Sequence, residues 1–355
     1  MPPTTTTTLP SYTVTYNGNS NTGGSVPSSR TTDSPFTVAA NSGSLVRLGY
    51  TFASWNTAAN GSGTTYTANS STITLTANTT LYAQWTAATL TVTTDEQGGS
   101  AIANASTTTG ASMASPGTPT RSGYTFAGWF TASGGGSAIS FPYAHGQTAN
   151  FTLYAQWTAD SLTVTTDEQG GSAIANASTT TGASMASPGT PTRSGYTFAG
   201  WFTASGGGSA ISFPYAHGQT ANFTLYAQWT ADSLTVTTDE QGGSAIANAS
   251  TTTGASMASP GTPTRSGYTF AGWFTASGGG SAISFPYAHG QTANFTLYAQ
   301  WTADSLTVTT DEQGGSAIAN ASTTTGASMA SPGTPTRSGY TFAGWFTASS
   351  GGSAL

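Results

Sequence analysis

"GYTFAGWF", at residues 123–130, is the stretch that decides the fold of this chain. The same eight letters begin again at Gly195, Gly267 and Gly339, and a looser copy, GYTFASWN, begins at Gly49. The four matching copies stand 72 residues apart, and a text beginning LTVTTDEQGG recurs at the same interval. An enzyme needs one good pocket, so five copies of an aromatic octet indicate that length or valency matters. The fixed interval predicts a row of small modules.

A second series of tryptophans closes each copy and sets the predicted domain boundaries. It contains Trp157, Trp229 and Trp301, at the end of the text TLYAQW. Cutting after these tryptophans gives a flexible Thr/Pro leader at 1–10, a divergent module at 11–86, full modules at 87–158, 159–230 and 231–302, and an incomplete module at 303–355. The incomplete module lacks the text SFPYAHGQTANFTLYAQW. We expect either a truncated chain or a last strand that comes from elsewhere.

Composition restricts the functional classes. Aromatic residues reach 11%, whereas charged residues make up only 5%, against about 25% in typical domains. The net charge is −6, so binding to nucleic acid or to anionic lipid through positive charge is not expected. Cysteine and lysine are both absent, which excludes disulfides, thiolate sites and Lys–Asn isopeptide crosslinks. No apolar run is long enough to predict membrane insertion, and the leader does not read as a signal peptide.

The first half of the module at 159–230 predicts a hairpin. LTVTT, which begins at Leu162, alternates apolar and polar residues as a half-buried strand does. EQGGS follows as a turn, and AIANASTTTG reads as a second, weaker strand paired with the first. Residues 183–187 have room for one helical turn at most, because Pro188 lacks a backbone donor and biases its predecessor toward extended geometry.

The second half of the module supplies the core. Tyr196 and Phe198 share one face of a strand, and Trp201 has the opposite parity, so we expect a β-bulge at Gly200. The closing strand FTLYAQW directs Trp229 and every second residue before it inward. The predicted core aromatics are Tyr196, Phe198, Trp201 and Trp229. The fold class is mostly β, α+β at most, in small modules joined in a semi-rigid row by the four residues TADS at 230–233.

Three joined motifs of the first module carry a family resemblance. YTVTYNGNSNTGGSVP, GYTFASWNTAANGSGTTY and TLYAQW resemble the Listeria–Bacteroides repeat, which is related to the B repeat of internalin-type surface proteins. The resemblance implies a β-grasp-like fold and a place in long secreted or cell-surface bacterial proteins. It brings no catalytic residues. The stretch at 93–115, TTDEQGGSAIANASTTTGASMAS, departs from the family's usual opening turn.

Four residues of the module at 87–158 are candidates for contacts with a ligand or a neighbouring module: Arg121, Tyr143, His145 and Tyr154. The arginine is expected to stack on a tyrosine or to pair with a turn acid. The histidine occurs once per module, which gives no metal site without a partner, so a polar loop residue is the expected role. The two tyrosines could stack on sugar rings, but edge packing between modules is the favoured interpretation.

The acidic residues predict neither catalysis nor a metal site. Asp167 and Glu168 are adjacent on an extended chain and therefore point to opposite faces. Asp160 and Asp232 stand at module junctions, where a calcium ion could bind, but solvated turn acids are the favoured interpretation. We expect no cofactor. Asn104 and Asn150 lie in glycosylation sequons, which are expected to be mostly unmodified in a bacterial protein.

Two functional hypotheses remain, and both place the protein at the cell surface or outside the cell. The first is a non-catalytic stalk, spacer or filament-forming segment whose partners are its own neighbouring modules. The alternative is a multivalent adhesin that binds glycans or a host surface protein. Enzymatic activity ranks third. The open fifth module exposes a strand edge, which invites pairing with another copy of the chain.

Overall fold

The computed structural model describes residues 9–355, so most of the predicted leader lies outside the described residues. The described residues form strands, turns and loops, and none of them forms a helix. The predicted fold class, mostly β in tandem modules, is confirmed. We name the residues 11–86, 87–158, 159–230, 231–302 and 303–355 repeat one to repeat five.

The chain divides into two compact units. The first holds the residues up to 163 together with 178–185 and 216–223, and the second holds 164–177, 186–215 and 224–355. Repeats one and two therefore lie wholly in the first unit, and repeats four and five lie in the second. Repeat three contributes residues to both. Among the described residues there is no helix that is long and apolar enough to cross a membrane.

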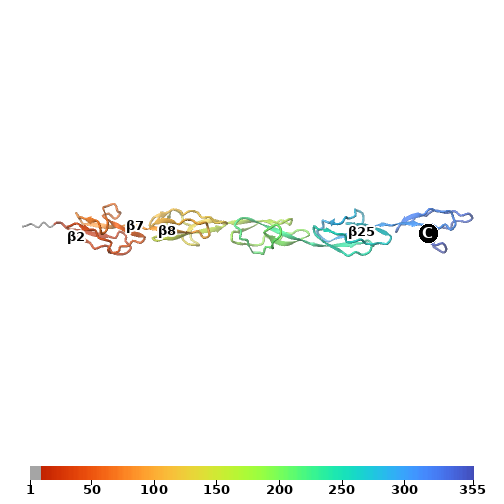
Figure 1. Cartoon of the computed structure of the whole chain (residues 1–355), viewed down its shortest axis with the longest axis horizontal. Helices are drawn as coiled ribbons and strands as arrows, with labels where there is room; N and C mark the ends of the chain where they lie inside the picture. The colour runs from red at the N-terminus through yellow and green to blue at the C-terminus, as the bar shows by residue number, and fades with distance from the viewer. Residues whose placement is uncertain (1–8) are drawn as a thin grey trace, which may run out of the picture. The chain divides into compact units, whose positions relative to one another are not determined.

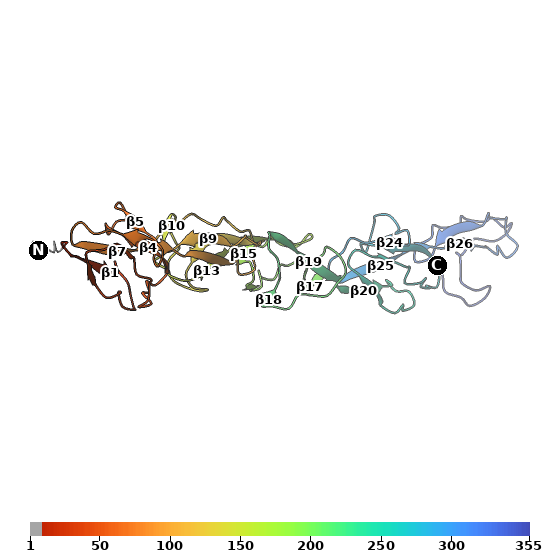
Figure 2. The same cartoon turned by 60° about the vertical axis from the view of Figure 1, so that its left-hand side comes forward.

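Repeat one folds around a five-stranded sheet with the order β2-β1-β7-β4-β5, and a small second sheet pairs β3 with β6. Figures 1 and 2 show these strands at the N-terminal end of the chain. Its strands are β1 (Tyr12–Asn17), β2 (Arg30–Thr32), β3 (Phe36–Thr37), β4 (Tyr50–Asn56), β5 (Thr65–Tyr66), β6 (Thr72–Ile73) and β7 (Thr79–Ala87).

Repeats two and four have the same four-stranded sheet. Its first and last strands are parallel neighbours at the centre, and an antiparallel partner lies outside each of them. A parallel pair needs a long crossover, and here the crossover contains the octet strand and a two-stranded ribbon. The strands are β8 (Thr89–Asp95), β9 (Ala105–Thr108), β10 (Ser112–Met113), β11 (Tyr124–Phe130), β12 (Tyr143–Ala144) and β13 (Phe151–Ala159) in repeat two, and β20 (Ser233–Asp239), β21 (Ala249–Thr252), β22 (Ser256–Met257), β23 (Tyr268–Phe274), β24 (Tyr287–Ala288) and β25 (Phe295–Ala303) in repeat four.

Repeat three has the same set of strands as repeats two and four, whereas repeat five has fewer. Repeat three has β14 (Ser161–Asp167), β15 (Ala177–Thr180), β16 (Ser184–Met185), β17 (Tyr196–Phe202), β18 (Tyr215–Ala216) and β19 (Phe223–Ala231). Repeat five keeps only the first hairpin, β26 (Ser305–Val308) with β27 (Ala321–Thr324).

The octet strand contains the predicted bulge. The register between β17 and β19 shifts between Phe198 and Gly200, which brings Trp201 to the core face. Gly200 has a φ of +132°, a value that suits glycine. The same shift occurs in repeat one with Ser54 at that place, so the bulge does not require glycine.

Three predictions about local structure need correction. Residues 183–187 form no helical turn, because Ser184 and Met185 belong to the short strand β16. The second strand is shorter than predicted and begins only at Ala177 in repeat three. The linker is also shorter than the four residues of TADS. The closing strand β19 runs to Ala231 because it stays paired with the octet strand, and Asp232 alone separates it from β20.

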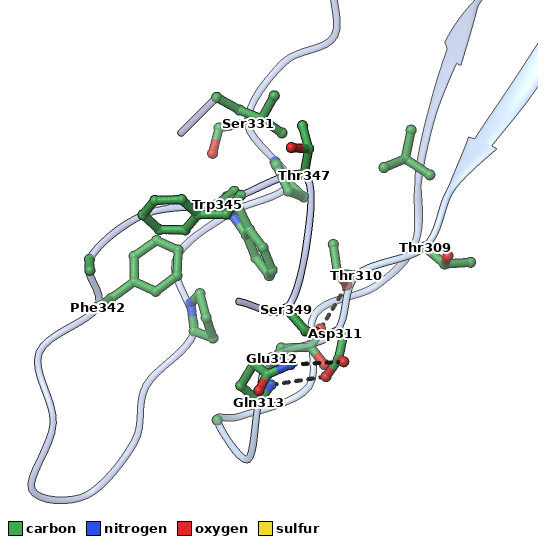
Figure 3. A pocket seen from close by; sticks show the side chains of 18 of the residues that line it. Thr309, Thr310, Asp311, Glu312, Gln313, Ser331, Phe342, Trp345, Thr347 and Ser349 are labelled. Carbon is green, nitrogen blue, oxygen red and sulfur yellow. Dashed lines mark hydrogen bonds between the residues drawn. The ribbon is translucent and has the colours of Figure 1, made fainter. Parts of the chain in front are cut away.

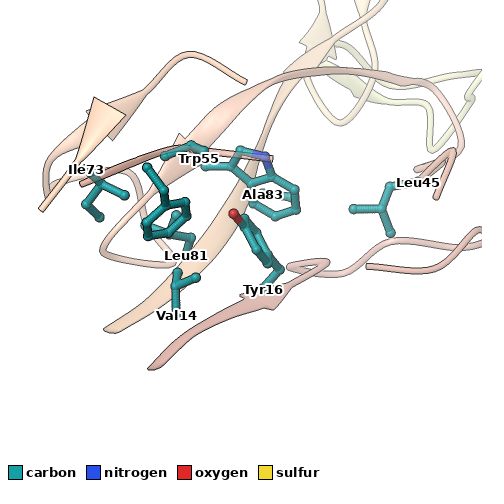
Figure 4. Packing of buried hydrophobic residues seen from close by; sticks show 9 residues of the cluster. Val14, Tyr16, Leu45, Trp55, Ile73, Leu81 and Ala83 are labelled. Atoms are coloured by element: carbon teal, nitrogen blue, oxygen red, sulfur yellow. The ribbon is translucent and has the colours of Figure 1, made fainter. Parts of the chain in front are cut away.

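The hydrophobic cores of repeats one, two and four are each made by residues of a single repeat. The core of repeat one surrounds the fully buried Trp55 and includes Val14, Tyr16 and Leu81, as Figure 4 shows. Repeats two and four have corresponding clusters around Trp129 and Trp273, each drawn from its own repeat. Each small core thus depends on one large indole, because aromatic side chains bury much apolar area per residue.

Candidate functional site

The junction between successive repeats is made by one residue that is hydrogen-bonded on both sides. Between repeats two and three this residue is Asp160, whose backbone N–H donates to the Gly123 carbonyl at 2.9 Å. Its own carbonyl accepts the N–H of Thr181 at 3.1 Å. Its side-chain Oδ1 accepts the hydroxyl of Thr125 at 2.7 Å. A linker fixed at three points loses the backbone freedom that would allow a hinge.

A glycine–threonine contact closes the junction beside this linker. A Cβ added to Gly123 would lie 2.6 Å from Oγ1 of Thr181 and 2.9 Å from Cβ of Thr220, both in repeat three. The glycine also has a φ of +76°, which disfavours other residues. Ser122 adds a hydroxyl hydrogen bond to Thr220 at 3.0 Å. Only glycine allows the two repeats to approach this closely.

Arg121 and Tyr124 support the same junction from repeat two. The Arg121 guanidinium lies 4.0 Å from the centroid of the Tyr124 ring and donates a hydrogen bond to the Gln97 carbonyl at 3.0 Å. The Tyr124 hydroxyl reaches repeat three, where a Cβ on Gly182 would lie 2.9 Å from it. The arginine therefore holds a tyrosine that contacts the next repeat.

The arrangement recurs along the chain. Corresponding hydrogen bonds and close glycine–threonine approaches are formed by Gly195, Asp232 and Thr253 and by Gly267, Asp304 and Thr325. The first junction has the same backbone bonds but carries Ala88 in place of the aspartate. It therefore lacks the side-chain bond that the other junctions form. These junction acids are partly exposed. Within residues 9–355 no three His, Asp or Glu side chains are placed to hold a metal ion.

His145 is a buried residue of its own repeat rather than a polar loop residue. Its side chain is 6% exposed, and its ring centroid lies 5.1 Å from that of Phe151. Its Nδ1 accepts the N–H of Gln147 at 2.9 Å, which leaves Nε2 as the donor toward the Thr107 hydroxyl at 3.4 Å. The imidazole ring of His145 thus holds the predicted loop against the sheet. The polar residues around it in the sequence did not indicate that this ring is buried.

The two candidate tyrosines differ in their surroundings. Tyr143 lies in β12, packs against the core of repeat two and makes an edge contact with Phe141 at 6.4 Å between ring centroids. Tyr154 lies on the other face of the sheet, between Phe130 of β11 and Asp95 of β8, and is partly exposed. Among the described residues, no ring contact joins either tyrosine to a neighbouring repeat, so the structure does not bring the four candidates together into one site.

The predicted core aromatics have two different roles, one in the core and one at the junction. Trp201 is 1% exposed, and Phe198 packs edge-on against both Trp201 and Trp229. Tyr196 instead serves the junction, since Arg193 stacks on it at 3.9 Å and its hydroxyl approaches Gly254. The alternation of side chains along the strand could not distinguish the core role of Phe198 from the junction role of Tyr196, because both residues point to the same face.

The turn acids organise the first hairpin. Asp95 accepts the N–H of Gln97 at 3.0 Å, and Glu96 accepts the N–H of Ile102 at 2.9 Å. Burial raises the pKa of Glu96, but the hydrogen bonds from Ile102 and Thr94 lower it by more, so its pKa lies below the ordinary value. The Glu96 carbonyl accepts the indole N–H of Trp157 at 2.9 Å, which ties this turn to the closing strand.

Sequence reasoning missed the glycine–threonine contact. The signal was present, because a glycine opens every copy of the octet and a TTTG text recurs in every later repeat. Nothing in the sequence showed that these two texts meet across a junction.

Comparison with known proteins agrees with the internal repetition. The family model described as the Listeria-Bacteroides repeat domain matches residues 12–84, 91–156, 163–228, 235–300 and 307–355. No curated protein matches the chain. Repeats of this family occur in surface and extracellular proteins of bacteria and are generally structural. Because the five matches together span most of the sequence, the chain belongs to the Listeria-Bacteroides repeat family.

Proposed function

We propose that this chain is a stalk or spacer segment of a bacterial cell-surface or extracellular protein, which holds another part of that protein away from the surface. The observation that carries the proposal is the junction linker. A single residue such as Asp160 joins two repeats, and both of its backbone groups are hydrogen-bonded. A spacer needs joints that resist bending, and joints with a free linker of several residues would not supply that resistance.

The recurrence of the joint supports the same proposal. Four junctions use the same backbone bonds and the same glycine–threonine approach. The hydrophobic cores of repeats one, two and four each consist of side chains from that repeat alone. An additional repeat would therefore add length without changing the cores of its neighbours.

Small-angle X-ray scattering tests this proposal. A compact globule of this chain length has a radius of gyration of about 20 Å. We expect a much larger value for the full chain, and a maximum dimension that falls by a constant step when repeat two, or repeats two and three, are deleted. A radius near that of the globule, or a dimension that does not follow repeat number, would reject the spacer.

Multivalent adhesion is the second candidate function. Repeats two to four share nearly the same text, so any weak surface site would be presented three times on one chain. Tyr154 is the partly exposed aromatic residue that such a site would use, whereas Tyr143 and His145 pack within their own repeat. A glycan array probed with the full chain and with a Tyr154→Ala, Tyr226→Ala, Tyr298→Ala variant separates the two functions. A signal that the triple variant loses favours adhesion, and an empty array favours the spacer.

A further inference from the structure

The first and the closing strand of repeats one to four lie side by side. In repeat two, β8 and β13 pair in parallel, from Val92 with Phe151 to Asp95 with Tyr154. Repeats one and four have the same parallel pair, formed by β1 with β7 and by β20 with β25. The sheet of repeat three has the same strand order. The chain therefore enters and leaves each of these repeats through two strands that are neighbours in one sheet.

This pairing decides how a repeat responds to tension along the chain. Strand β8 begins at Thr89, before the first pair, and β13 continues to Ala159, beyond the last pair. Tension therefore pulls the two strands along their axes in opposite directions. The bonds of a parallel ladder are evenly spaced and run across the strands, so all of them are loaded together. If both strands were pulled from the same end, these bonds would break one after another.

A side-chain hydrogen bond holds the beginning of this ladder. Asn150 precedes β13, and its Oδ1 accepts the backbone N–H of Thr91 in β8 at 2.8 Å. The corresponding bonds, at 2.8 or 2.9 Å, join Asn78 to Thr13, Asn222 to Thr163 and Asn294 to Thr235. Asn150, which the sequence places in a glycosylation sequon, therefore has a structural role as a bond between the two strands.

A second hydrogen bond holds the end of the ladder. The indole N–H of Trp157 in β13 donates to the Glu96 carbonyl, in the turn that follows β8, at 2.9 Å. Movement of β13 along its axis would separate Trp157 from this turn. Corresponding bonds join Trp85 to the carbonyls of Gly18 and Asn19, Trp229 to that of Glu168 and Trp301 to that of Glu240.

The turn that accepts the indole is shaped by its own side chains. Figure 3 shows this turn in repeat five, where the Thr310 hydroxyl donates to Glu312 at 2.7 Å and the side-chain amide of Gln313 donates to Asp311 at 3.1 Å. A turn with such local bonds gives the tryptophan a fixed attachment point.

The side chains of the two strands also interlock in the core. Val92 and Leu153 are fully buried in one cluster with Trp129 of the octet strand. Strand β13 is paired along its other edge with β11 as well. Movement of β13 along its axis would therefore break two ladders and pull Leu153 out of a close-packed core.

We infer that repeats one to four are mechanical clamps, which keep their fold under tension because their first and closing strands resist sliding past each other. The inference rests on the proposed spacer function, since a segment that holds another part of the protein carries the force on that part. It adds a property that stiff joints alone do not supply, because a rod can be straight and still unfold at a low force.

Pulling single molecules of the full chain with optical tweezers tests the inference. The chain has neither lysine nor cysteine, so one handle attaches to the amino group of residue 1 and the other to a single introduced cysteine. Ser161→Cys places the second handle after the closing strand of repeat two, so repeats one and two are both sheared. Ala149→Cys places it before that strand, so repeat one is sheared but repeat two is pulled from one end of its parallel pair. Both positions are exposed.

We expect repeat two to open at a force at least about twofold higher with Ser161→Cys than with Ala149→Cys, because bonds loaded together resist more than bonds broken singly. In the Ala149→Cys chain the shorter release identifies repeat two, since fewer of its residues lie between the handles and an extended chain gains about 3.5 Å per residue. Repeat one is the internal control and should open at the same force in both chains.

Equal opening forces for repeat two in the two chains would overturn the clamp. They would leave the spacer in place, because scattering tests the spacer separately. A compact radius of gyration together with the twofold difference in force would instead reject the spacer and support the clamp.

Two core substitutions in the Ser161→Cys chain separate mechanical resistance from overall stability. Leu153→Ala removes a fully buried side chain of the parallel pair, so one of the two opening events should move to a lower force. Met113→Ala truncates a buried side chain of similar size in β10, outside that pair. It should destabilise repeat two comparably in urea but leave the opening force almost unchanged. Equal losses of force would show that force follows overall stability, and they would overturn the clamp.

Discussion

Gly123 and Thr181 meet across the junction between repeats two and three, where a Cβ on the glycine would lie 2.6 Å from the threonine hydroxyl oxygen. This oxygen is buried and has no conventional hydrogen-bond partner. The hydrogen that the glycine carries in the Cβ direction points at it, which is the geometry of a weak Cα–H···O contact. The same unpaired oxygen recurs at Thr109, Thr253 and Thr325, so the weak contact is part of every joint.

The first prediction concerns this contact. Gly123→Ala should destabilise the joint by about 1–2 kcal/mol through its positive φ and by about 1–3 kcal/mol more through overpacking against Thr181. The backbone amides of Asp160 and Thr181 should exchange their hydrogens faster, because their hydrogen bonds cross the same joint. Hydrogen exchange followed by NMR or mass spectrometry measures this effect.

Two other glycines of repeat two serve as controls that separate the cost of the positive φ from the cost of overpacking. Gly135 has a φ of +72° with open space around it, so Gly135→Ala pays only the conformational cost. Gly134 has open space and no positive φ, so Gly134→Ala should be nearly neutral. If Gly123→Ala costs no more than Gly135→Ala, the close approach to Thr181 does not hold the joint.

The second prediction concerns the core of repeat one. Trp55 is fully buried, donates its indole N–H to the Ala39 carbonyl at 3.0 Å and packs edge-on against Tyr16. Trp55→Ala should cost roughly 3–5 kcal/mol, because it opens a cavity and removes the indole partner of the partly buried Ala39 carbonyl. Urea unfolding followed by hydrogen exchange in β1 and β7 measures the loss.

Leu48→Ala is the matched control for the tryptophan. Leu48 also belongs to repeat one but is 65% exposed, so its truncation should change stability by less than about 0.5 kcal/mol. Equal losses for the two variants would mean that this core does not stabilise repeat one.

The strand pattern was readable from the sequence because it depends on local chemistry. Alternation in LTVTT predicted the buried Leu162 and Val164, and the change of phase before Trp201 predicted the bulge. Family membership followed from motifs that lie close together in the sequence. These features need no knowledge of which distant residues meet.

The joint was not readable because its parts are far apart in sequence. Gly195 and Thr253 belong to different repeats, and each text alone reads as a turn. The burial of His145 was missed for the same reason, since its partners Thr107 and Phe151 lie on separate strands. The length of the linker was misjudged because pairing with the octet strand extends β19 to Ala231.

The third prediction concerns pH. Burial raises the pKa of Glu168, and hydrogen bonds from Thr166 and Ile174 lower it by more, so its folded pKa lies below the ordinary value. A lowered folded pKa gives stability that is present above the unfolded pKa and is lost as pH falls through the folded pKa. Repeat three should therefore be less stable in acid than at neutral pH, and the loss should occur below the ordinary pKa of a glutamate. Hydrogen exchange in β14 and β19, measured as a function of pH, follows this loss.

Glu168→Gln is the control for the pH prediction. Glutamine keeps an oxygen that accepts the N–H of Ile174 but cannot titrate. The variant should lose part of the acid dependence of repeat three and leave that of repeat two, which depends on Glu96, unchanged. An unaltered pH dependence in repeat three would show that this carboxyl is not the cause.

The last prediction separates the two contacts of Tyr268. Arg265 stacks on its ring at 3.9 Å, and its hydroxyl approaches Gly326 in the next repeat, where a Cβ would lie 3.1 Å away. Arg265→Gln should cost about 0.5–2 kcal/mol, because the stacking cation and its bond to the Gln241 carbonyl are lost. Tyr268→Phe keeps the ring under the guanidinium and removes only the hydroxyl, so it should leave the stability of repeat four almost unchanged.

Measuring both variants by hydrogen exchange assigns each contact to a role. Arg265→Gln should speed exchange in β23 and at the joint amide of Thr325, since the tyrosine is no longer held in place. Tyr268→Phe should speed exchange at Thr325 alone. If Tyr268→Phe leaves Thr325 unaffected while Arg265→Gln loosens β23, the hydroxyl does not stabilise the joint, and the arginine serves repeat four by itself. That result would leave the linker Asp304 and the Gly267–Thr325 approach as the parts that hold repeats four and five together.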